Sequence, residues 1–236
     1  MPFRLLDGFR NIFEGQAYRH RSSTQGDRLA RLVYEDLYTL NRSAVFNNRI
    51  DSFDCVVNIT NRVTGIRQRR GDGTFGESLP TVPGVKESGF YVGIGPTANV
   101  QIGIEIKIIA TAMIKQIDRV INDLRNQASQ FKNRSSSAIA IAIVGVNHSA
   151  RYSSYEGDRV FIAEGARSPA AEAPKAVQRL DAGARHYYDE FIILPFQATN
   201  SAPFPYDWVD LVSTENTYSA ALIRTLRLYE TRFPQR

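Results

Sequence analysis

Residues 100–110 of this chain alternate almost without exception between isoleucine and other side chains. The even-numbered positions 102, 104, 106 and 108 are all isoleucine. Because successive side chains of a strand point to opposite faces of a sheet, this pattern predicts a strand with one face in a core. The odd-numbered residues, which include Glu105 and Lys107, must then share the other face, with Glu105 and Lys107 about 7 Å apart.

The segments around this strand predict an α/β fold with a mixed central sheet flanked by helices, in a single domain over residues 1–236. Residues 113–131 carry apolar side chains at helical spacing. Residues 138–146 form a continuous apolar run, which is typical of a buried central strand. We further expect helices over 27–40, 169–187 and 216–233, strands over 50–60 and 191–195, and a basic loop over 62–77.

Composition narrows the chemistry that the chain can carry. Among 236 residues, 29 Lys+Arg and 24 Asp+Glu give a net charge of +5, which permits a nucleic-acid partner without requiring one. One cysteine, Cys55, excludes an internal disulfide, and with three histidines it leaves oxygen atoms as the expected metal ligands. No apolar run approaches the length of a membrane span, and the N-terminus lacks the apolar segment of a signal peptide. We therefore expect a cytoplasmic protein with no membrane association.

Residues 90–95 also alternate, and we expect them to pair with residues 100–110 as a hairpin that turns at 96–99. For the two apolar faces to coincide, Glu87 must lie on the face of Glu105 and near Lys107. Glycines at 89, 93 and 103 would keep that patch clear of side chains. The predicted arrangement is therefore two carboxylates and one lysine around an open patch.

Such a group suits hydrolysis of a phosphodiester bond with the help of a metal ion. Two carboxylates and a backbone carbonyl can hold Mg²⁺ together with several of its waters. The ion polarises the phosphoryl oxygen and lowers the pKa of a bound water, and a lysine can position or activate that water and stabilise the developing charge. The alternative is a surface ion pair between Glu105 and Lys107, which would contribute only about 0–1 kcal/mol to stability.

At this point the sequence resembles the PD-(D/E)xK nuclease superfamily, to which many restriction endonucleases belong. The resemblance lies in the Glu105-Ile-Lys107 strand, which follows a predicted hairpin and precedes a helix and a buried strand. Residues 27–147 then match the family order α-β-β-β-α-β as a restriction-endonuclease-like core, with additions at both ends, the C-terminal one covering 148–236. The resemblance implies a Mg²⁺-dependent DNA endonuclease that acts as a homodimer and cuts both strands.

The sequence departs from the family pattern at the first acid, which is usually an Asp at the start of the second hairpin strand. Residues 86–90 contain no Asp, so Glu87 is the candidate for that role and, with Glu105, for metal binding. The resemblance also implies an assisting acid from the first helix, either Glu35 or Asp36 with Glu35 preferred, and an assisting Gln116. Without a first acid, the chain would be a catalytically inactive DNA-binding or assembly module that retains the fold.

Four arginines in the predicted basic loop are candidates for binding DNA. A contact from each to a phosphate would increase the salt dependence of binding. The alternative is a loop that is simply solvated. The residues concerned are Arg62, Arg67, Arg69 and Arg70.

Overall fold

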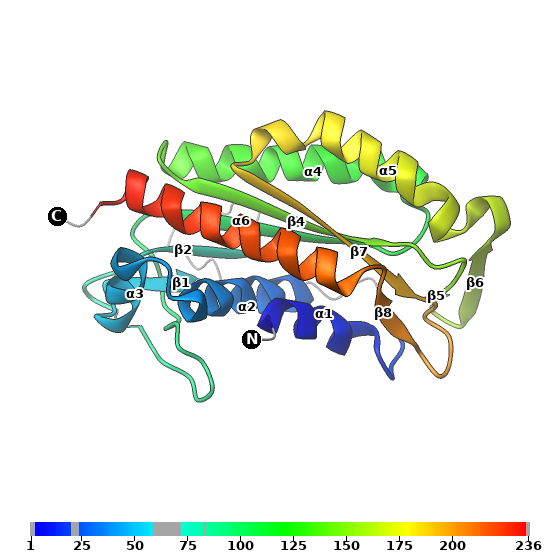
Figure 1. Cartoon of the computed structure of the whole chain (residues 1–236), viewed down its shortest axis with the longest axis horizontal. Coiled ribbons are helices and arrows are strands. Elements are labelled where there is room, and N and C mark those ends of the chain that lie inside the picture. Colours follow the sequence, from blue (N-terminus) through cyan, green and yellow to red (C-terminus); the bar gives the residue numbers. More distant parts are fainter. Residues whose placement is uncertain (1–2, 20–23, 59–71, 83, 235–236) are drawn as a thin grey trace.

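A six-stranded sheet runs through the molecule in the strand order β1-β2-β3-β4-β7-β8 (Figure 1). The computed structural model describes residues 3–19, 24–58, 72–82 and 84–234. The central strands β3, β4 and β7 are parallel, whereas β1 and β2 on one side and β8 on the other are antiparallel to their neighbours. The strands are β1 (Cys55–Asn58), β2 (Gly73–Glu77), β3 (Ile102–Ile109), β4 (Ile139–Asn147), β7 (Glu190–Ala198) and β8 (Tyr206–Trp208).

Helices cover both faces of this sheet, which confirms the predicted α/β class. One layer contains α4 and α5, and α1, α2 and α6 pack against the other face (Figure 1). A separate two-stranded ribbon, β5–β6, follows β4 in the chain. The bounds are α1 (Arg4–Phe13), α2 (Thr24–Leu40), α3 (Ala44–Asp51), α4 (Met113–Arg134), α5 (Pro169–Gly183), α6 (Leu211–Arg232), β5 (Arg151–Glu156) and β6 (Arg159–Glu164).

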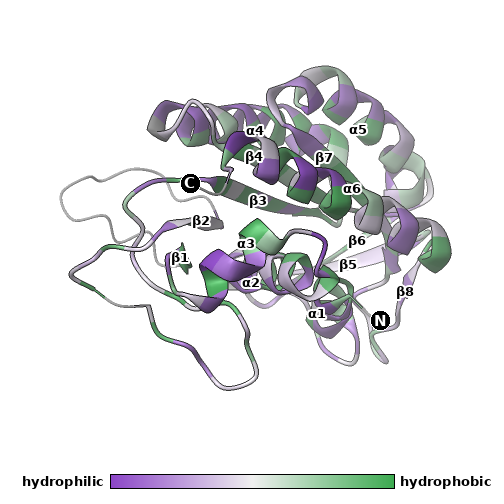
Figure 2. Ribbon diagram, turned by 60° about the vertical axis from the view of Figure 1, so that its left-hand side comes forward, coloured by the Kyte–Doolittle hydropathy of each residue, from purple (hydrophilic) through white to green (hydrophobic). Residues whose placement is uncertain are grey.

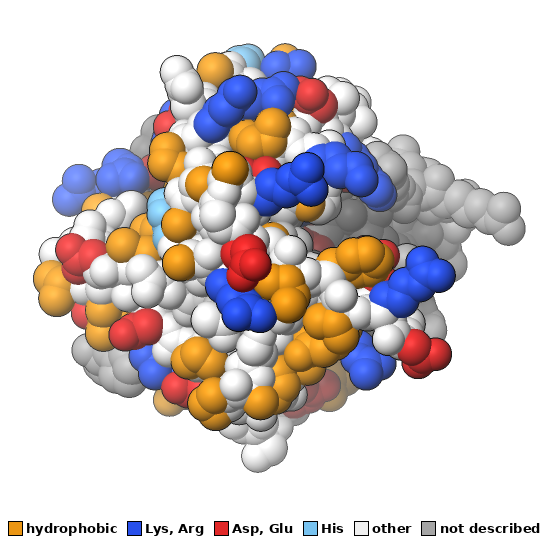
Figure 3. Space-filling model, turned by 90° about the vertical axis from the view of Figure 1, so that its right-hand side faces the viewer, with side chains coloured by type: hydrophobic (Ala, Val, Ile, Leu, Met, Phe, Trp, Pro, Cys, Tyr) orange, Lys and Arg blue, Asp and Glu red, His pale blue; other side chains and the backbone are white. Residues whose placement is uncertain are grey.

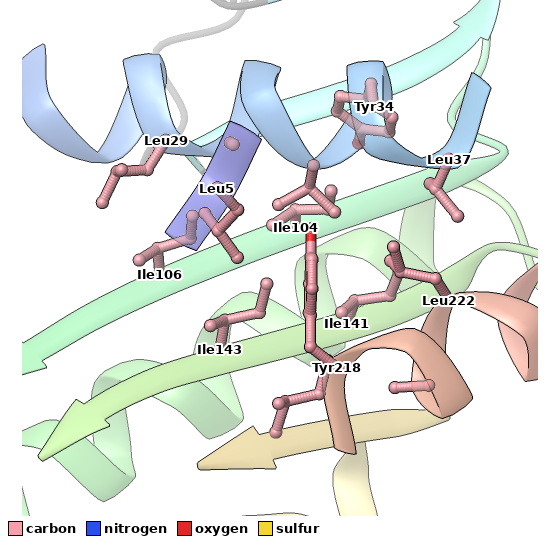
Figure 4. Packing of buried hydrophobic residues seen from close by; sticks show 14 of the residues in the cluster. Leu5, Leu29, Tyr34, Leu37, Ile104, Ile106, Ile141, Ile143, Tyr218 and Leu222 are labelled. Atoms are coloured by element: carbon pink, nitrogen blue, oxygen red, sulfur yellow. The ribbon is translucent and has the colours of Figure 1, made fainter. Parts of the chain in front are cut away.

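The predicted alternation in β3 is confirmed, because its two sets of side chains enter two different cores. Ile104 and Ile106 point away from α4, together with Ile141 and Ile143 of β4, toward side chains from α1, α2 and α6 (Figure 4). Figure 2 shows hydrophobic residues concentrated on the inner strands, with hydrophilic residues on the outer helix surfaces. The second core lies between the sheet and the pair α4 and α5. The odd-numbered side chains of β3 therefore lie beneath α4 and not on an open surface.

Gly103 shows how closely α4 packs on this face of β3. A side chain at this position would overlap the ring of Phe131, which lies directly over the glycine. The sequence predicted that Gly103 keeps the polar patch clear, and this is wrong, because Phe131 fills the space. Gly93, expected to do the same, lies instead against Phe53.

Replacing Gly103 with Ala should destabilise the protein by about 1–3 kcal/mol, because the added methyl group overpacks a filled site. Urea unfolding followed by circular dichroism measures this difference. The control is Ser129→Ala on the exposed side of α4, which should change stability by less than about 0.5 kcal/mol. Equal stability of both variants would contradict the packing of Phe131 on Gly103.

The predicted hairpin between residues 90–95 and 100–110 is wrong. β3 pairs instead with β2 on one side and β4 on the other. The segment around Ile94 lies at the outer edge of β1, where it forms isolated bridges with Val57 and Val85. Residues 90–95 were expected to be a strand and form only the bridges of Ile94, so alternation in the sequence decided neither that a strand forms there nor what it pairs with.

The remaining sequence predictions differ mainly in extent. Helices near 27–40, 113–131, 169–187 and 216–233 and strands near 138–146 and 191–195 are confirmed. Within the predicted strand over 50–60, residues 55–58 form β1 and residues 59–60 lie outside the described chain. Ile50 belongs to α3, whose N-cap Ser43 accepts a hydrogen bond from the Phe46 N–H. The predicted loop over 62–77 is wrong for residues 73–77, which form β2, and its residues 62–71 lie outside the described chain. Helices α1 and α3 and the ribbon β5–β6 were not predicted.

Among the described residues, none of the helices combines the length and the apolar character needed to cross a membrane.

Candidate active site

The pairing of β2 with β3 brings an acid that the sequence analysis did not name, Asp72, next to the strand that carries Glu105 and Lys107. Gly73 is the register partner of Ile104, so the preceding residue, Asp72, lies opposite Glu105. The Asp72 side chain is fixed there because its Oδ2 accepts a hydrogen bond of 2.7 Å from the backbone N–H of Ile106. On its other side is Gly26 of α2, where any side chain would overlap the Asp72 carboxylate. Backbone on two sides therefore holds this carboxylate beside Glu105.

Glu105 and Lys107 form a close ion pair beneath α4. Lys107 Nζ lies 2.6 Å from Glu105 Oε1, and the side chains are 29% and 5% exposed, respectively. The second oxygen, Glu105 Oε2, is buried and has no hydrogen-bond partner among the described residues. A buried carboxylate oxygen normally has a donor, so this atom can accept a further ligand.

The electrostatic state of the three groups follows from their burial and proximity. Burial, followed by the charge of Asp72, raises the pKa of Glu105 to about 7, although Lys107 opposes the shift. Burial also raises the pKa of Asp72, against the lowering effects of the Ile106 N–H and Lys107. Burial alone would lower the pKa of Lys107, but Glu105 and Asp72 outweigh it and raise that pKa. Two mutually repelling carboxylates with one positive neighbour are an arrangement that an added cation would stabilise.

Side chains from α4 and from the segment before β7 surround this group. Asp123 of α4 is close enough for its charge to raise the pKa values of both Glu105 and Lys107, and it also pairs with Arg119 at 4.0 Å. Tyr188 donates a hydrogen bond of 2.7 Å to the Leu124 carbonyl. Burial, followed by the charges of Glu105 and Asp72, raises the Tyr188 pKa. The sequence analysis named neither Asp123 nor Tyr188, because their approach depends on how α4 crosses the sheet.

Glu87 does not occupy the predicted position. Its carboxylate forms an ion pair with Arg31 Nη1 at 2.5 Å, and its side chain is 54% exposed. The prediction relied on pairing residues 90–95 with β3, and that pairing does not occur. The structure therefore replaces Glu87 by Asp72 as the carboxylate next to Glu105.

Glu35, the predicted assisting acid, is fully buried, but its described contacts are with residues other than Glu105 and Lys107. Its two carboxylate oxygens accept hydrogen bonds from the backbone N–H groups of Tyr91 and Val92. Arg4 adds an ion pair at 3.2 Å. The neighbouring Asp36 accepts from the Arg4 and Leu5 N–H groups at the start of α1. Both acids hold backbone in the layer on the opposite side of the sheet from Glu105, which corrects the prediction that Glu35 assists at the site.

The other predicted residues are not brought to Glu105 by any described contact. Gln116 is exposed in the first turn of α4, where its Nε2 donates weakly to the Thr111 carbonyl at 3.4 Å. The four arginines at 62, 67, 69 and 70 lie outside the described residues, so their contacts with DNA stay a prediction.

Asp72 and Glu105 fit a hard divalent cation as a two-carboxylate pair. Among the described residues there is no group of three or more His, Cys, Asp or Glu side chains placed to hold a metal ion. Ions of the Mg²⁺ type need only one or two carboxylates, since they retain several waters. The unpartnered Glu105 Oε2 and the raised pKa values of both acids agree with such a ligand.

No protein-family model matches this chain, and no curated protein matches it significantly in sequence.

Proposed function

We propose that this chain is a Mg²⁺-dependent DNA endonuclease that hydrolyses phosphodiester bonds in the manner of a type II restriction enzyme. The observation that carries the proposal is the convergence of Asp72, just before β2, with Glu105 and Lys107 of the neighbouring strand β3. The PD-(D/E)xK superfamily, which the sequence resembles, usually has its first acid as an Asp at the start of the second hairpin strand. Asp72 directly precedes β2, which supports the resemblance at the point where the sequence alone departed from it.

The order of the elements also supports the proposal. The helix α2 is followed by β1, β2, β3, α4 and β4, which is the family order α-β-β-β-α-β with the short α3 inserted. The Glu105-Ile-Lys107 tripeptide lies on the third of these strands, as in the family pattern. The order of the elements and the positions of the two acids and the lysine along them therefore both agree with the family pattern.

In this proposal Asp72 and Glu105 hold the metal ion, with waters and a backbone carbonyl completing its ligands. Bound Mg²⁺ would polarise a phosphoryl oxygen and lower the pKa of a coordinated water. Glu105 Oε2, which is buried and has no donor in the described part of the chain, is the oxygen available to bind it. The Ile106 N–H keeps the Asp72 carboxylate in place for the same purpose.

Lys107 acts as a hydrogen-bond donor in this mechanism. Its raised pKa keeps it protonated at neutral pH, so it cannot take a proton from water there. The ammonium group can instead orient the attacking water and stabilise the negative charge that develops on the phosphate. DNA would be held in part by Arg62, Arg67, Arg69 and Arg70, and a homodimer would present one such site to each strand.

The decisive experiment is incubation of the full chain with plasmid and with single-stranded DNA, in Mg²⁺ or in EDTA. We expect cleavage only with Mg²⁺, and a rate at least about 100-fold lower for Lys107→Ala. Lys115→Ala, at an exposed lysine of α4, is the matched control and should cleave normally. Cleavage that persists in EDTA or in Lys107→Ala would contradict the site assignment. Retention of DNA without cleavage by the wild type would contradict the enzyme and favour the binding module.

A further inference from the structure

The ribbon β5–β6 presents an edge strand that is open along its whole length. β6 pairs with β5 over six consecutive residues, without a bulge, and the described chain forms no further strand on its other side. β5 is tied to the body, since the Ser153 N–H donates to the Thr199 carbonyl at 2.9 Å and Asn200 Nδ2 donates to the Ser153 carbonyl at 2.7 Å. β6 is therefore the outer strand, with its backbone groups facing solvent.

The exposed side chains of β6 are unusually apolar for an edge strand. Val160, Phe161 and Ile162 are consecutive and each at least half exposed. Open edges are normally protected by lysine, proline, a bulge or short length, and β6 has none of the first three. Elsewhere in the described chain, the outer edge of β1 is covered through Val57 by the segment around Ile94, and β8 is only three residues long.

The apolar surface extends beyond β6 at the same end of the molecule. Val209, Leu211 and Val212, at the start of α6, are also among the exposed large hydrophobic residues. Figures 1 and 2 both place the start of α6 near β8 and the ribbon. Figure 3 looks onto this end and shows hydrophobic side chains gathered in clusters between charged ones. Exposed large apolar side chains gathered at one end of a molecule are typical of an interaction site.

We propose that β6 pairs antiparallel with β6 of a second copy of this chain, so that the two ribbons form one four-stranded sheet across a twofold axis. The charges at the strand ends disfavour the parallel orientation. A parallel partner related by a twofold axis would place Arg159 opposite Arg159 and Glu164 opposite Glu164, whereas an antiparallel partner separates these like charges.

The side chains also select one register. A twofold axis perpendicular to the sheet keeps each side chain on its own face, so a residue on the axis lies opposite its own symmetry mate. With Phe161 on the axis, Val160 lies opposite Ile162 of the second copy on one face, and Phe161 lies opposite its own symmetry mate on the other face. With Ile162 on the axis, Val160 would face Glu164, and with Val160 on the axis, Ile162 would face Asp158. Of the three registers, only the one centred on Phe161 pairs Val160, Phe161 and Ile162 exclusively with apolar residues; it places Arg159 opposite Ala163, and Glu164 opposite Asp158, which precedes the strand.

The test is the oligomeric state of the full chain by sedimentation velocity from about 1 to 100 µM. We expect a dimer for the wild type. V160K/I162K places like charges opposite each other, and V160K/I162E places opposite charges there, although both lose the same apolar contacts. We expect the Lys/Lys variant to dissociate and the Lys/Glu variant to dimerise at least about 10-fold more tightly than it. Val82→Lys, at an exposed valine far along the chain, is the control and should remain dimeric.

Three outcomes would overturn the proposal: a wild type that is monomeric throughout, a dimer that survives V160K/I162K, or no recovery in V160K/I162E. The inference rests on the proposed function only in bringing two active sites together, and its readout does not involve DNA. Lys107→Ala should therefore remain dimeric, so a failure of cleavage and a failure of dimerisation can be told apart.

Discussion

Replacing Asp72 with Asn is expected to lower the rate of Mg²⁺-dependent DNA cleavage by at least about 100-fold, since a ligand to the metal should cost at least as much as a group that merely supports one. Asparagine can still accept the hydrogen bond from the Ile106 N–H that now holds the carboxylate. The fold should therefore be retained. The lower cleavage rate should then result from the loss of negative charge at the site. Initial rates of plasmid cleavage and calorimetric Mg²⁺ titrations measure the two consequences.

The matched control for this variant is Glu87→Gln, which removes the acid that the sequence alone favoured. Because Glu87 is half exposed and pairs with Arg31, its replacement should leave the cleavage rate and Mg²⁺ affinity nearly unchanged. The reverse result, with cleavage lost in Glu87→Gln and kept in Asp72→Asn, would restore the sequence-based assignment and contradict the structural one.

Replacing Glu105 with Gln is expected to stabilise the metal-free protein at pH 8 while abolishing cleavage. The pKa of Glu105 is raised in the folded protein from 4.5 to about 7, first by burial and then by the charge of Asp72. The folded state thus binds a proton more tightly than the unfolded state. The contribution of the Glu105 carboxyl group to the free energy of unfolding is most favourable below pH 4.5 and is lost as the pH rises from 4.5 to about 7. Above that range the charged side chain destabilises the fold by up to about 3 kcal/mol.

Urea unfolding in EDTA at pH 4 and pH 8 measures this effect. The two proteins should differ little at pH 4, where Glu105 is neutral in the folded state, and Glu105→Gln should be more stable at pH 8. Added Mg²⁺ should then stabilise the wild type and not the variant, because a ligand that binds only the folded state raises its stability. A variant less stable than the wild type at pH 8 would show that the ion pair with Lys107 serves stability and would contradict a metal site.

Together, these two expectations describe a site that is unfavourable for the fold without its ligand. Two carboxylates share a buried position with one lysine, and one carboxylate oxygen has no donor from residues 3–19, 24–58, 72–82 and 84–234. A purely structural ion pair would be expected to satisfy its buried atoms. The local cost in stability is what distinguishes a prepared binding site from a surface salt bridge, the alternative that the sequence left open.

Several features of the fold were accessible from local sequence patterns. The alternation in β3 correctly separated Ile104 and Ile106 from Glu105 and Lys107, because side chains in a strand have a period of two whatever the strand pairs with. The continuous apolar run of β4 and the apolar stripe of α4 were equally readable, since a buried strand and an amphipathic helix each have their own pattern.

The acid partner of Glu105 was not accessible in the same way. β2 has the sequence Gly-Thr-Phe-Gly-Glu, in which Phe75 is the one large apolar residue, so it carries little strand signal. The segment around Ile94 carries a stronger signal and was paired with β3 instead, although it lies at the edge of β1. A helpful sign was Asp72 itself, an acid next to a glycine at the end of the basic stretch.

The sequence by itself therefore determined the α/β class, the two faces of β3, and the presence of Glu105 and Lys107 on one of them. Only the tertiary structure decided that Asp72 completes the group, that Glu35 and Glu87 serve other contacts, and that α4 covers the site. The physical reason is that the face on which a side chain lies follows from the local period of the backbone. Strand pairing and helix packing depend on contacts between residues far apart in the chain. Alternative pairings differ in the free energy of these contacts, which a local sequence pattern does not contain.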